Sequence, residues 1–188
     1  MSGNREQLAV LFADISGSAD LYERLGDERA LQSIAHCVGI MTRDLPSCQG
    51  TLVKTIGDEI MCTFPSAEQA FHAACLMQGA VEGSRYQDGT PMHIRIGFHY
   101  GEVTRESGDV FGDTVNVAAR VAAITRAGQI IVTQAVVDVL PPALRDKTRL
   151  LRRAESKDKL VQSGIYMVIW ASDEKLNTRI GTPAQRKS

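Results

Sequence analysis

The sequence lacks the excess of positive charge that is typical of nucleic-acid-binding proteins. Its 188 residues carry 21 Lys and Arg against 22 Asp and Glu, a formal net charge of −1. The short basic run RLLRR at 149–153 is typical of a solvated face rather than of a groove for a polyanion. We therefore expect no nucleic-acid partner, whereas a small anionic ligand held by a few placed groups remains compatible with this charge.

Zinc-binding spacing and long apolar runs are also missing. None of Cys37, Cys48, Cys62 and Cys75 forms a CxxC pair or a Cys/His spacing suited to zinc, and three of them lie in apolar patterns where a buried thiol is expected. No run approaches the roughly 18 apolar residues of a membrane span, and the start MSGNREQ is not a signal peptide. We expect a reducing, cytoplasmic location and no membrane contact by this chain itself.

Apolar periodicity predicts one α+β domain over residues 1–172. The order of the expected elements indicates helices in one layer on one face of a mostly antiparallel sheet. Residues 173–188 show no apolar period and are expected to form a flexible tail. The expected strands are 8–13, 51–56, 59–64, 93–100, 129–132 and 164–170, and the expected helices are 18–25, one from 27, one from 66, one from 112, and 133–140.

Two aspartates stand at strand ends. Asp14 follows the first apolar strand, and Asp58 lies in the two-residue connection Gly57-Asp58 of a predicted hairpin. Such carboxylates suit a hard, oxygen-seeking cation such as Mg²⁺ or Mn²⁺. The turn Ile15-Ser16-Gly17-Ser18 then offers backbone N–H groups at a helix start, a ready anion site. The alternative for Asp58 is a simple turn former, since Asp favours turns.

A second group of polar residues lies on the helix that follows Gly112. Asn116 and Arg120 are four residues apart and therefore share a helical face, while Val115, Ala118 and Ala122 are expected to face the core. Taken alone, this pair could equally be an ordinary solvated pair on a surface helix.

The order of four motifs resembles that of class III adenylate cyclases. The matching segments are FADISGS at 12–18, VKTIGDEIMC at 53–62, RIGFHYGEV at 95–103 and DVFGDTVNVAAR at 109–120. They follow the family's order and spacing over most of residues 7–135. The resemblance implies a ferredoxin-like sheet of the nucleotide cyclase type and conversion of ATP to 3′,5′-cyclic AMP and pyrophosphate.

The resemblance also implies a role for each site residue. Asp14, Ile15 and Asp58 would bind two Mg²⁺ or Mn²⁺ ions, with the turn of residues 15–18 at the substrate phosphates. Lys54 and Asp109 would select adenine, because guanine-specific members place Glu and Cys there. Asn116 would orient the ribose, Arg120 would stabilise the transition state, and Arg95 would lie near the terminal phosphates. For the triphosphate-binding lysine, Lys157 and Lys159 both remain candidates.

The family works as a head-to-tail pair whose sites lie at the interface between chains. Since this single chain carries every role, the resemblance implies a homodimer with two equivalent sites. Family catalytic domains are commonly fused to membrane or sensor segments, and we allow for such a segment in a longer natural protein.

Two other functions compete with this interpretation. A diguanylate cyclase shares the Gly57-Asp58-Glu59 hairpin, but Thr55-Ile56 stands where that family has glycine, and the segment 109–120 has no place there. A non-catalytic module descended from a cyclase would be expected to have lost a metal aspartate, the asparagine or the arginine, and this chain retains all of them.

Overall fold

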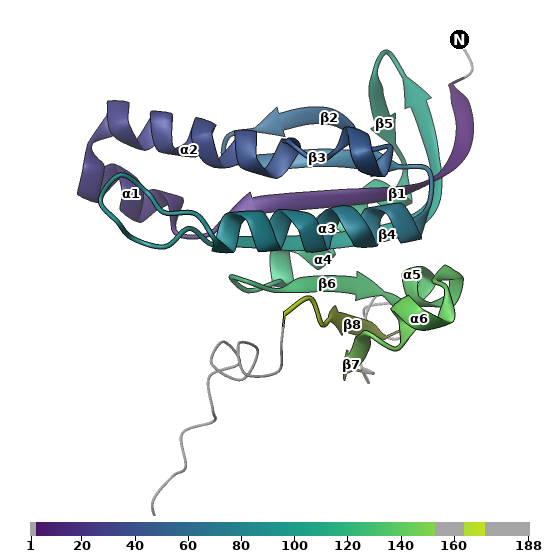
Figure 1. Ribbon diagram of the computed structural model, residues 1–188. Coiled ribbons are helices and arrows are strands. Elements are labelled where there is room, and N and C mark those ends of the chain that lie inside the picture. The colour runs from purple at the N-terminus through teal and green to yellow at the C-terminus, as the bar shows by residue number, and fades with distance from the viewer. Residues whose placement is uncertain (1–2, 153–163, 172–188) are drawn as a thin grey trace, which may run out of the picture.

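The computed structural model describes residues 3–152 and 164–171 (Figure 1). They form a sheet in the order β2-β3-β1-β4-β6-β8-β7, with β5 paired to β4. Only the β4–β6 pairing is parallel among the pairs the structure describes. The strands are β1 (Asn4–Ile15), β2 (Thr51–Ile56), β3 (Glu59–Phe64), β4 (Ile94–Glu106), β5 (Asp109–Phe111), β6 (Ile130–Thr133), β7 (Thr148–Arg152) and β8 (Ile165–Val168).

Helices cover both faces of this sheet. One face of the central strand β1, through Leu11 and its neighbours in alternate positions, packs against α2 and α3. The other face, including Val10, packs against Ala118 and Ala122 of α4. The helices are α1 (Ser18–Leu25), α2 (Asp27–Thr42), α3 (Ala67–Glu82), α4 (Asp113–Ile124), α5 (Gln134–Val139) and α6 (Pro142–Arg145), with a 3₁₀ turn at Pro46–Cys48.

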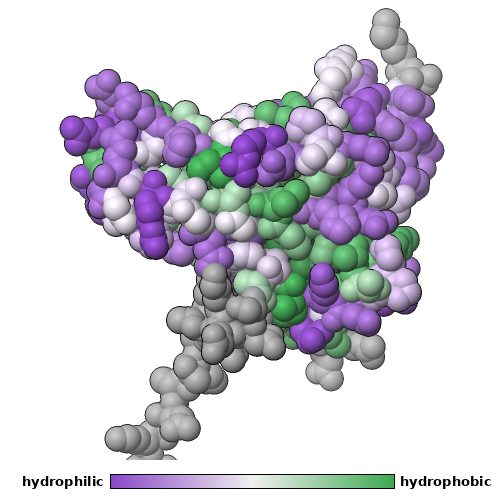
Figure 2. Space-filling view, in the orientation of Figure 1, coloured by the Kyte–Doolittle hydropathy of each residue, from purple (hydrophilic) through white to green (hydrophobic). Residues whose placement is uncertain are grey.

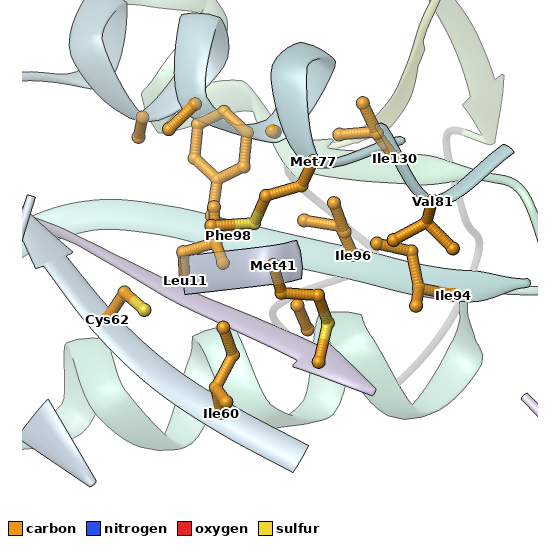
Figure 3. Close-up of a cluster of buried hydrophobic side chains, with 14 of the residues drawn as sticks. Leu11, Met41, Ile60, Cys62, Met77, Val81, Ile94, Ile96, Phe98 and Ile130 are labelled. Carbon is orange, nitrogen blue, oxygen red and sulfur yellow. The ribbon is translucent and has the colours of Figure 1, made fainter. Parts of the chain in front are cut away.

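The α+β class with a mostly antiparallel sheet is confirmed, and α4 adds a second layer to the single one expected. The physical reason lies in β1, which is apolar at successive positions and therefore needs cover on both faces. The larger core lies between the sheet and α2 and α3. Figure 3 shows side chains from both layers meeting there, among them Leu11, Met41, Ile60, Met77, Phe98 and Ile130.

Helix α4 lies directly on the backbone of β4. A Cβ atom added to Gly97 would lie 2.4 Å from the backbone nitrogen of Ala122, and one added to Gly101 would lie 2.6 Å from Thr114 Oγ1. Only glycine permits so close an approach of helix and strand. The position of α4 relative to the sheet is therefore set by the β4 backbone.

Most expected elements occur at the expected places. The β2–β3 hairpin has the predicted bounds. Of the predicted capping box, the structure shows the bond from the Gln69 N–H to Ser66 Oγ at 3.3 Å, whereas Gln69 Oε1 is buried without a partner among the described residues. Strands β5 and β7 and helix α6 were not expected. The tail predicted at 173–188 lies outside the described residues, so the boundary at 172 remains a prediction.

The surface in Figure 2 is mostly hydrophilic over α1 and the start of α2, and more hydrophobic around β6, α5 and α6. Among the described residues, no helix is both long enough and apolar enough to cross a membrane.

Candidate active site

Asp14 and Arg95 are paired at the end of the two central strands. They occupy directly opposite positions in the antiparallel β1–β4 register, where side chains of one face lie close together. Arg95 donates from Nε at 2.8 Å and from Nη2 at 2.6 Å, and both bonds go to Oδ2 of Asp14. Because Arg95 uses only one carboxylate oxygen, the pair leaves Oδ1 of Asp14 for other partners.

The charges of three carboxylates, those of Asp14, Asp58 and Glu59, act on one another at this point. Burial raises the pKa of Asp14 above its ordinary value; hydrogen bonds from Arg95 oppose this rise, and the charge of Asp58 adds to it. Burial also raises the pKa of Glu59, which lies opposite Asp14 on β3, and the charge of Asp14 adds to that rise. The concentration of buried negative charge exceeds what Arg95 compensates, so a cation would be stabilised here.

Two of these carboxylates, Asp14 and Asp58, border a cleft of about 530 Å³. The cleft is lined by the strand end and the following turn, by the β2–β3 turn, by Arg95, and by the segment after α4: Asp14, Ile15, Ser16, Gly17, Ser18, Ala19, Asp58, Arg95, Thr125, Arg126 and Ala127. The structure thus brings together seven residues that the sequence assigned to the metals and the phosphates, namely Asp14, Ile15, Ser16, Gly17, Ser18, Asp58 and Arg95.

The turn after Asp14 uses part of its hydrogen-bonding capacity within the fold. The N–H of Ile15 donates to the Asp58 carbonyl at 3.2 Å, and that of Ser16 to the His93 carbonyl at 2.9 Å. The anion site expected over residues 15–18 therefore narrows to the N–H groups from Gly17 onward, where α1 begins. The buried Ser16 Oγ has no hydrogen-bond partner in the described part of the chain and borders the same cleft.

The donors at the cleft fit a hard divalent cation. Asp14 and Asp58 supply carboxylate oxygens, and no sulfur or imidazole ligand lines the cleft. Within residues 3–152 and 164–171, no three His, Cys, Asp or Glu side chains are grouped so that they could hold a metal by themselves. Mg²⁺ is commonly bound in this way, by one or two carboxylates together with substrate phosphates and water.

Lys54 and Asp109 form a second polar pair. Lys54 Nζ donates to Asp109 Oδ2 at 2.8 Å, and Asp109 Oδ1 accepts from the N–H of Val110 at 2.8 Å. The hydrogen bond from Lys54, followed by that from Val110, lowers the pKa of Asp109 below its ordinary value. Both side chains remain partly exposed, so a ligand can reach them.

Asn116 and Arg120 lie on exposed positions of α4, whose opposite side is buried through Thr114, Ala118 and Val121. The predicted shared face is therefore present. Neither residue lines the cleft at Asp14, and neither do Lys54 and Asp109. The predicted site residues fall into two groups within one chain, one at the metal cleft and one on β2, β5 and α4.

Sequence reasoning missed Glu59 and Arg126. Glu59 stands beside Asp58 in the same motif, so its position next to Asp14 follows only from the β1–β3 register. Arg126 reaches the cleft because α4 ends there. The two lysine candidates, Lys157 and Lys159, lie outside the described residues.

Comparison with known proteins identifies the chain's relatives. An adenylate cyclase of Streptomyces coelicolor is 35% identical over 135 residues, covering 71% of this chain and 34% of that protein. An adenylate cyclase of Streptomyces griseus is 36% identical over 125 residues, covering 65% and 30%. The chain spans about a third of the length of these relatives.

Solved structures show the same fold. The catalytic core of a rhodopsin-guanylyl cyclase with converted specificity, in complex with ATPαS, superposes with a TM-score of 0.81 at 23% identity, covering 88% of this chain and 97% of that one. The guanylyl cyclase Cya2 gives a TM-score of 0.73 at 22% identity, covering 89% and 93%. The family described as adenylate and guanylate cyclase catalytic domain matches residues 1–169, and the chain belongs to this family.

Proposed function

We propose that this chain is an adenylate cyclase domain that converts ATP to 3′,5′-cyclic AMP and pyrophosphate. The observation that carries the choice of ATP is the Lys54–Asp109 hydrogen bond, which places a donor and an acceptor side by side on an accessible surface. Adenine presents a ring nitrogen that accepts and an exocyclic amine that donates, which matches this pair. Guanine presents the reverse pattern and would leave both side chains unpaired.

The cleft at Asp14 provides the part of the proposed active site that binds the metal ions and the phosphates. When bound at Asp14 and Asp58, two Mg²⁺ or Mn²⁺ ions would lower the pKa of the ribose 3′-hydroxyl and neutralise the phosphates. The residues around them hold the triphosphate: the N–H groups at the start of α1 face its negative charge. Arg95 binds Asp14 through Oδ2 alone, so that Oδ1 takes no part in the ion pair.

The residues on α4 complete the proposed mechanism. Arg120 would meet the negative charge that develops at the α-phosphoryl group as the 3′-oxygen attacks. Asn116 would orient the ribose so that attack within one molecule is aligned with the departing pyrophosphate. We identify no side chain as a dedicated base for the 3′-hydroxyl proton.

The separation of the two groups of residues supports a homodimer. Neither Asn116 nor Arg120 lines the cleft at Asp14, so a second chain would have to present them to it. The elements that carry the second group also expose large apolar side chains, which mark interaction surfaces when they gather. These are Leu52 and Ile56 on β2, Phe111 on β5 and Ile124 on α4.

The purified chain is tested with ATP or GTP in the presence of Mg²⁺ or Mn²⁺, and the product is identified by mass spectrometry. We expect cyclic AMP from ATP, with Mn²⁺ at least as effective as Mg²⁺, and less cyclic GMP from GTP. The absence of any cyclic nucleotide at every protein concentration and with either metal would contradict the enzymatic proposal. A preference for GTP would keep the proposal that the chain is a nucleotide cyclase but would contradict the proposed role of Lys54 and Asp109 in selecting adenine.

A cytoplasmic location and a fused segment in a longer protein stay predictions.

A further inference from the structure

A second pocket lies between α2 and the loop that joins α3 to β4, and it shares no residue with the cleft at Asp14. Its volume is about 270 Å³. This is just below the range of about 300–1,000 Å³ that drug-sized ligands occupy, so the pocket suits a smaller molecule. It is lined by Gln32, Ser33, His36, Arg85, Tyr86, Gln87 and Met92.

Two of the residues that line this pocket, Ser33 and Tyr86, carry buried hydroxyl groups. Ser33 is 4% exposed and Tyr86 is 7% exposed. In the part of the chain that the structure describes, neither Ser33 Oγ nor the Tyr86 hydroxyl has a hydrogen-bond partner. Burial raises the pKa of Tyr86 to about 12, so its hydroxyl stays protonated and can donate at neutral pH. Buried polar groups are nearly always satisfied, so these two hydroxyls indicate a polar occupant.

The charges around the pocket favour an anion. Arg85 and His36 are among the lining residues, and no acidic side chain is. Asp88 of the same loop is engaged elsewhere, since it accepts from Arg24 Nε at 3.1 Å and from Thr90. The charges of Asp58 and Asp88 still act on the Tyr86 hydroxyl and raise its pKa, and the charge of Arg24 opposes them there. A carboxylate in the pocket would therefore depend on Arg85 for its positive partner.

The loop that forms the pocket is held in a fixed shape. The N–H of Tyr86 donates to the Thr90 carbonyl at 2.9 Å, and Arg24 of α1 binds Thr90 Oγ1 at 2.9 Å. Figure 1 shows this loop passing beside α1. Such a loop does not have to be ordered when a ligand binds, which lowers the cost of binding.

We propose that this pocket binds a small organic carboxylate. Arg85 supplies the positive charge, the hydroxyls of Ser33 and Tyr86 donate hydrogen bonds, and Met92 and the Tyr86 ring contact the apolar part of the ligand. Met92 directly precedes His93, whose carbonyl accepts from the Ser16 N–H in the turn at the metal cleft. The ligand would therefore rest against the segment that anchors this turn.

The test titrates benzoate into the ¹⁵N-labelled protein and follows backbone amide shifts by NMR, with benzamide as the neutral isostere. We expect saturable shifts in α2 and in residues 84–92 with benzoate, and binding at least tenfold weaker with benzamide. Arg85→Gln should weaken benzoate binding about tenfold, because a charge-assisted hydrogen bond is lost. Tyr86→Phe should weaken it severalfold while keeping the ring.

Arg43→Gln is the matched control, because Arg43 is an exposed arginine at the end of α2 that does not line the pocket. It should leave the affinity unchanged. The proposal would be overturned if benzoate caused no shifts, or shifts only at the cleft at Asp14. It would also be overturned if benzamide caused equal shifts or if Arg85→Gln left the affinity unchanged. In each of these cases water would be the only partner of the two hydroxyl groups. The test needs no catalysis, so its outcome is independent of whether the chain makes cyclic AMP.

Discussion

Lys54 and Asp109 are 55 residues apart in the sequence, yet Lys54 Nζ lies 2.8 Å from Asp109 Oδ2. The pair joins β2 to β5, two short strands of the same sheet that are not paired with each other in its strand order but lie in contact. Asp109 is fixed from two sides, because its other oxygen accepts from the N–H of Val110. Donor and acceptor are therefore held at a set spacing before any base arrives, which favours selective binding.

Exchanging this pair for Glu and Cys should change the choice of nucleotide. The double substitution Lys54→Glu with Asp109→Cys replaces a donor by an acceptor and removes the acceptor at 109. We expect kcat/KM for ATP to fall, and the ATP/GTP ratio to shift toward GTP by about 10- to 100-fold, because each wrong pairing leaves a buried polar group unsatisfied. Full conversion is not expected, since the rest of the pocket is unchanged. An unaltered ratio would refute the assignment of both residues.

The same pair makes a prediction about titration. The hydrogen bond from Lys54 is the first cause of the lowered pKa of Asp109. The native state therefore binds a proton less readily than the unfolded chain, so the stabilisation by this pair is present above the ordinary pKa and is lost as the pH falls through the lowered one. Lys54→Met should raise the pKa of Asp109, measured by ¹³C NMR of its carboxyl group. Lys147→Met, at another exposed lysine, should leave that pKa where it is.

Local sequence signals account for part of the fold and of the site. The β2–β3 hairpin was predictable because Gly57-Asp58 is a strong turn signal, and Gly57 indeed has a φ of 62°. The contact between Asp14 and Arg95 was not, because it depends on the β1–β4 register across 81 residues. Strand β5 is only three residues long, too short for a period to show. The apolar positions of β1 call for cover on both faces, but that α4 supplies this cover depends on its close approach to Gly97 of β4.

The contact between Gly97 and α4 can be tested by adding a single methyl group. Gly97→Ala would place a Cβ 2.4 Å from the Ala122 backbone nitrogen, so α4 would have to move. We expect a loss of about 1–3 kcal/mol in the free energy of unfolding, as for other overpacked sites, together with reduced cyclase activity. Urea denaturation measures the former.

Gly39→Ala provides the control, because Gly39 lies within α2 and a Cβ there would meet no atom within 4 Å. This substitution should stabilise the protein by up to about 1 kcal/mol. If both variants behaved alike, the position of α4 would not depend on Gly97.

Metal binding should appear as a gain in thermal stability. A ligand at 100 times its Kd stabilises the folded state by about 2.7 kcal/mol, which corresponds to a Tm increase of roughly 5–10 °C for a chain of this size. We expect Mn²⁺ to raise the Tm of the wild type and to have little effect on Asp14→Asn or Asp58→Asn. Asn at 58 keeps a residue that favours turns, so its effect reports on the carboxylate. An equal Mn²⁺ response in all three proteins would place the metal elsewhere.

The separation of the two groups of site residues leads to the most specific prediction. Asp14→Ala should be inactive because a metal ligand is missing, and Arg120→Ala nearly so because charge in the transition state is uncompensated. If these residues serve one site from opposite chains, a mixed dimer contains one site with both defects and one site with neither. Co-expression of the two variants should then restore activity.

Random pairing fixes the size of this rescue. Half of the dimers would be mixed and each would have one intact site, so about a quarter of wild-type activity should return. A mixture of Asp14→Ala with Asp58→Ala is the matched control, since both lesions lie in the same cleft and every site keeps one of them. That mixture should stay inactive. If mixed dimers of Asp14→Ala and Arg120→Ala are shown by affinity tags to form and yet remain inactive, both residues serve the same chain's site and the interface proposal is wrong, whatever the nucleotide product.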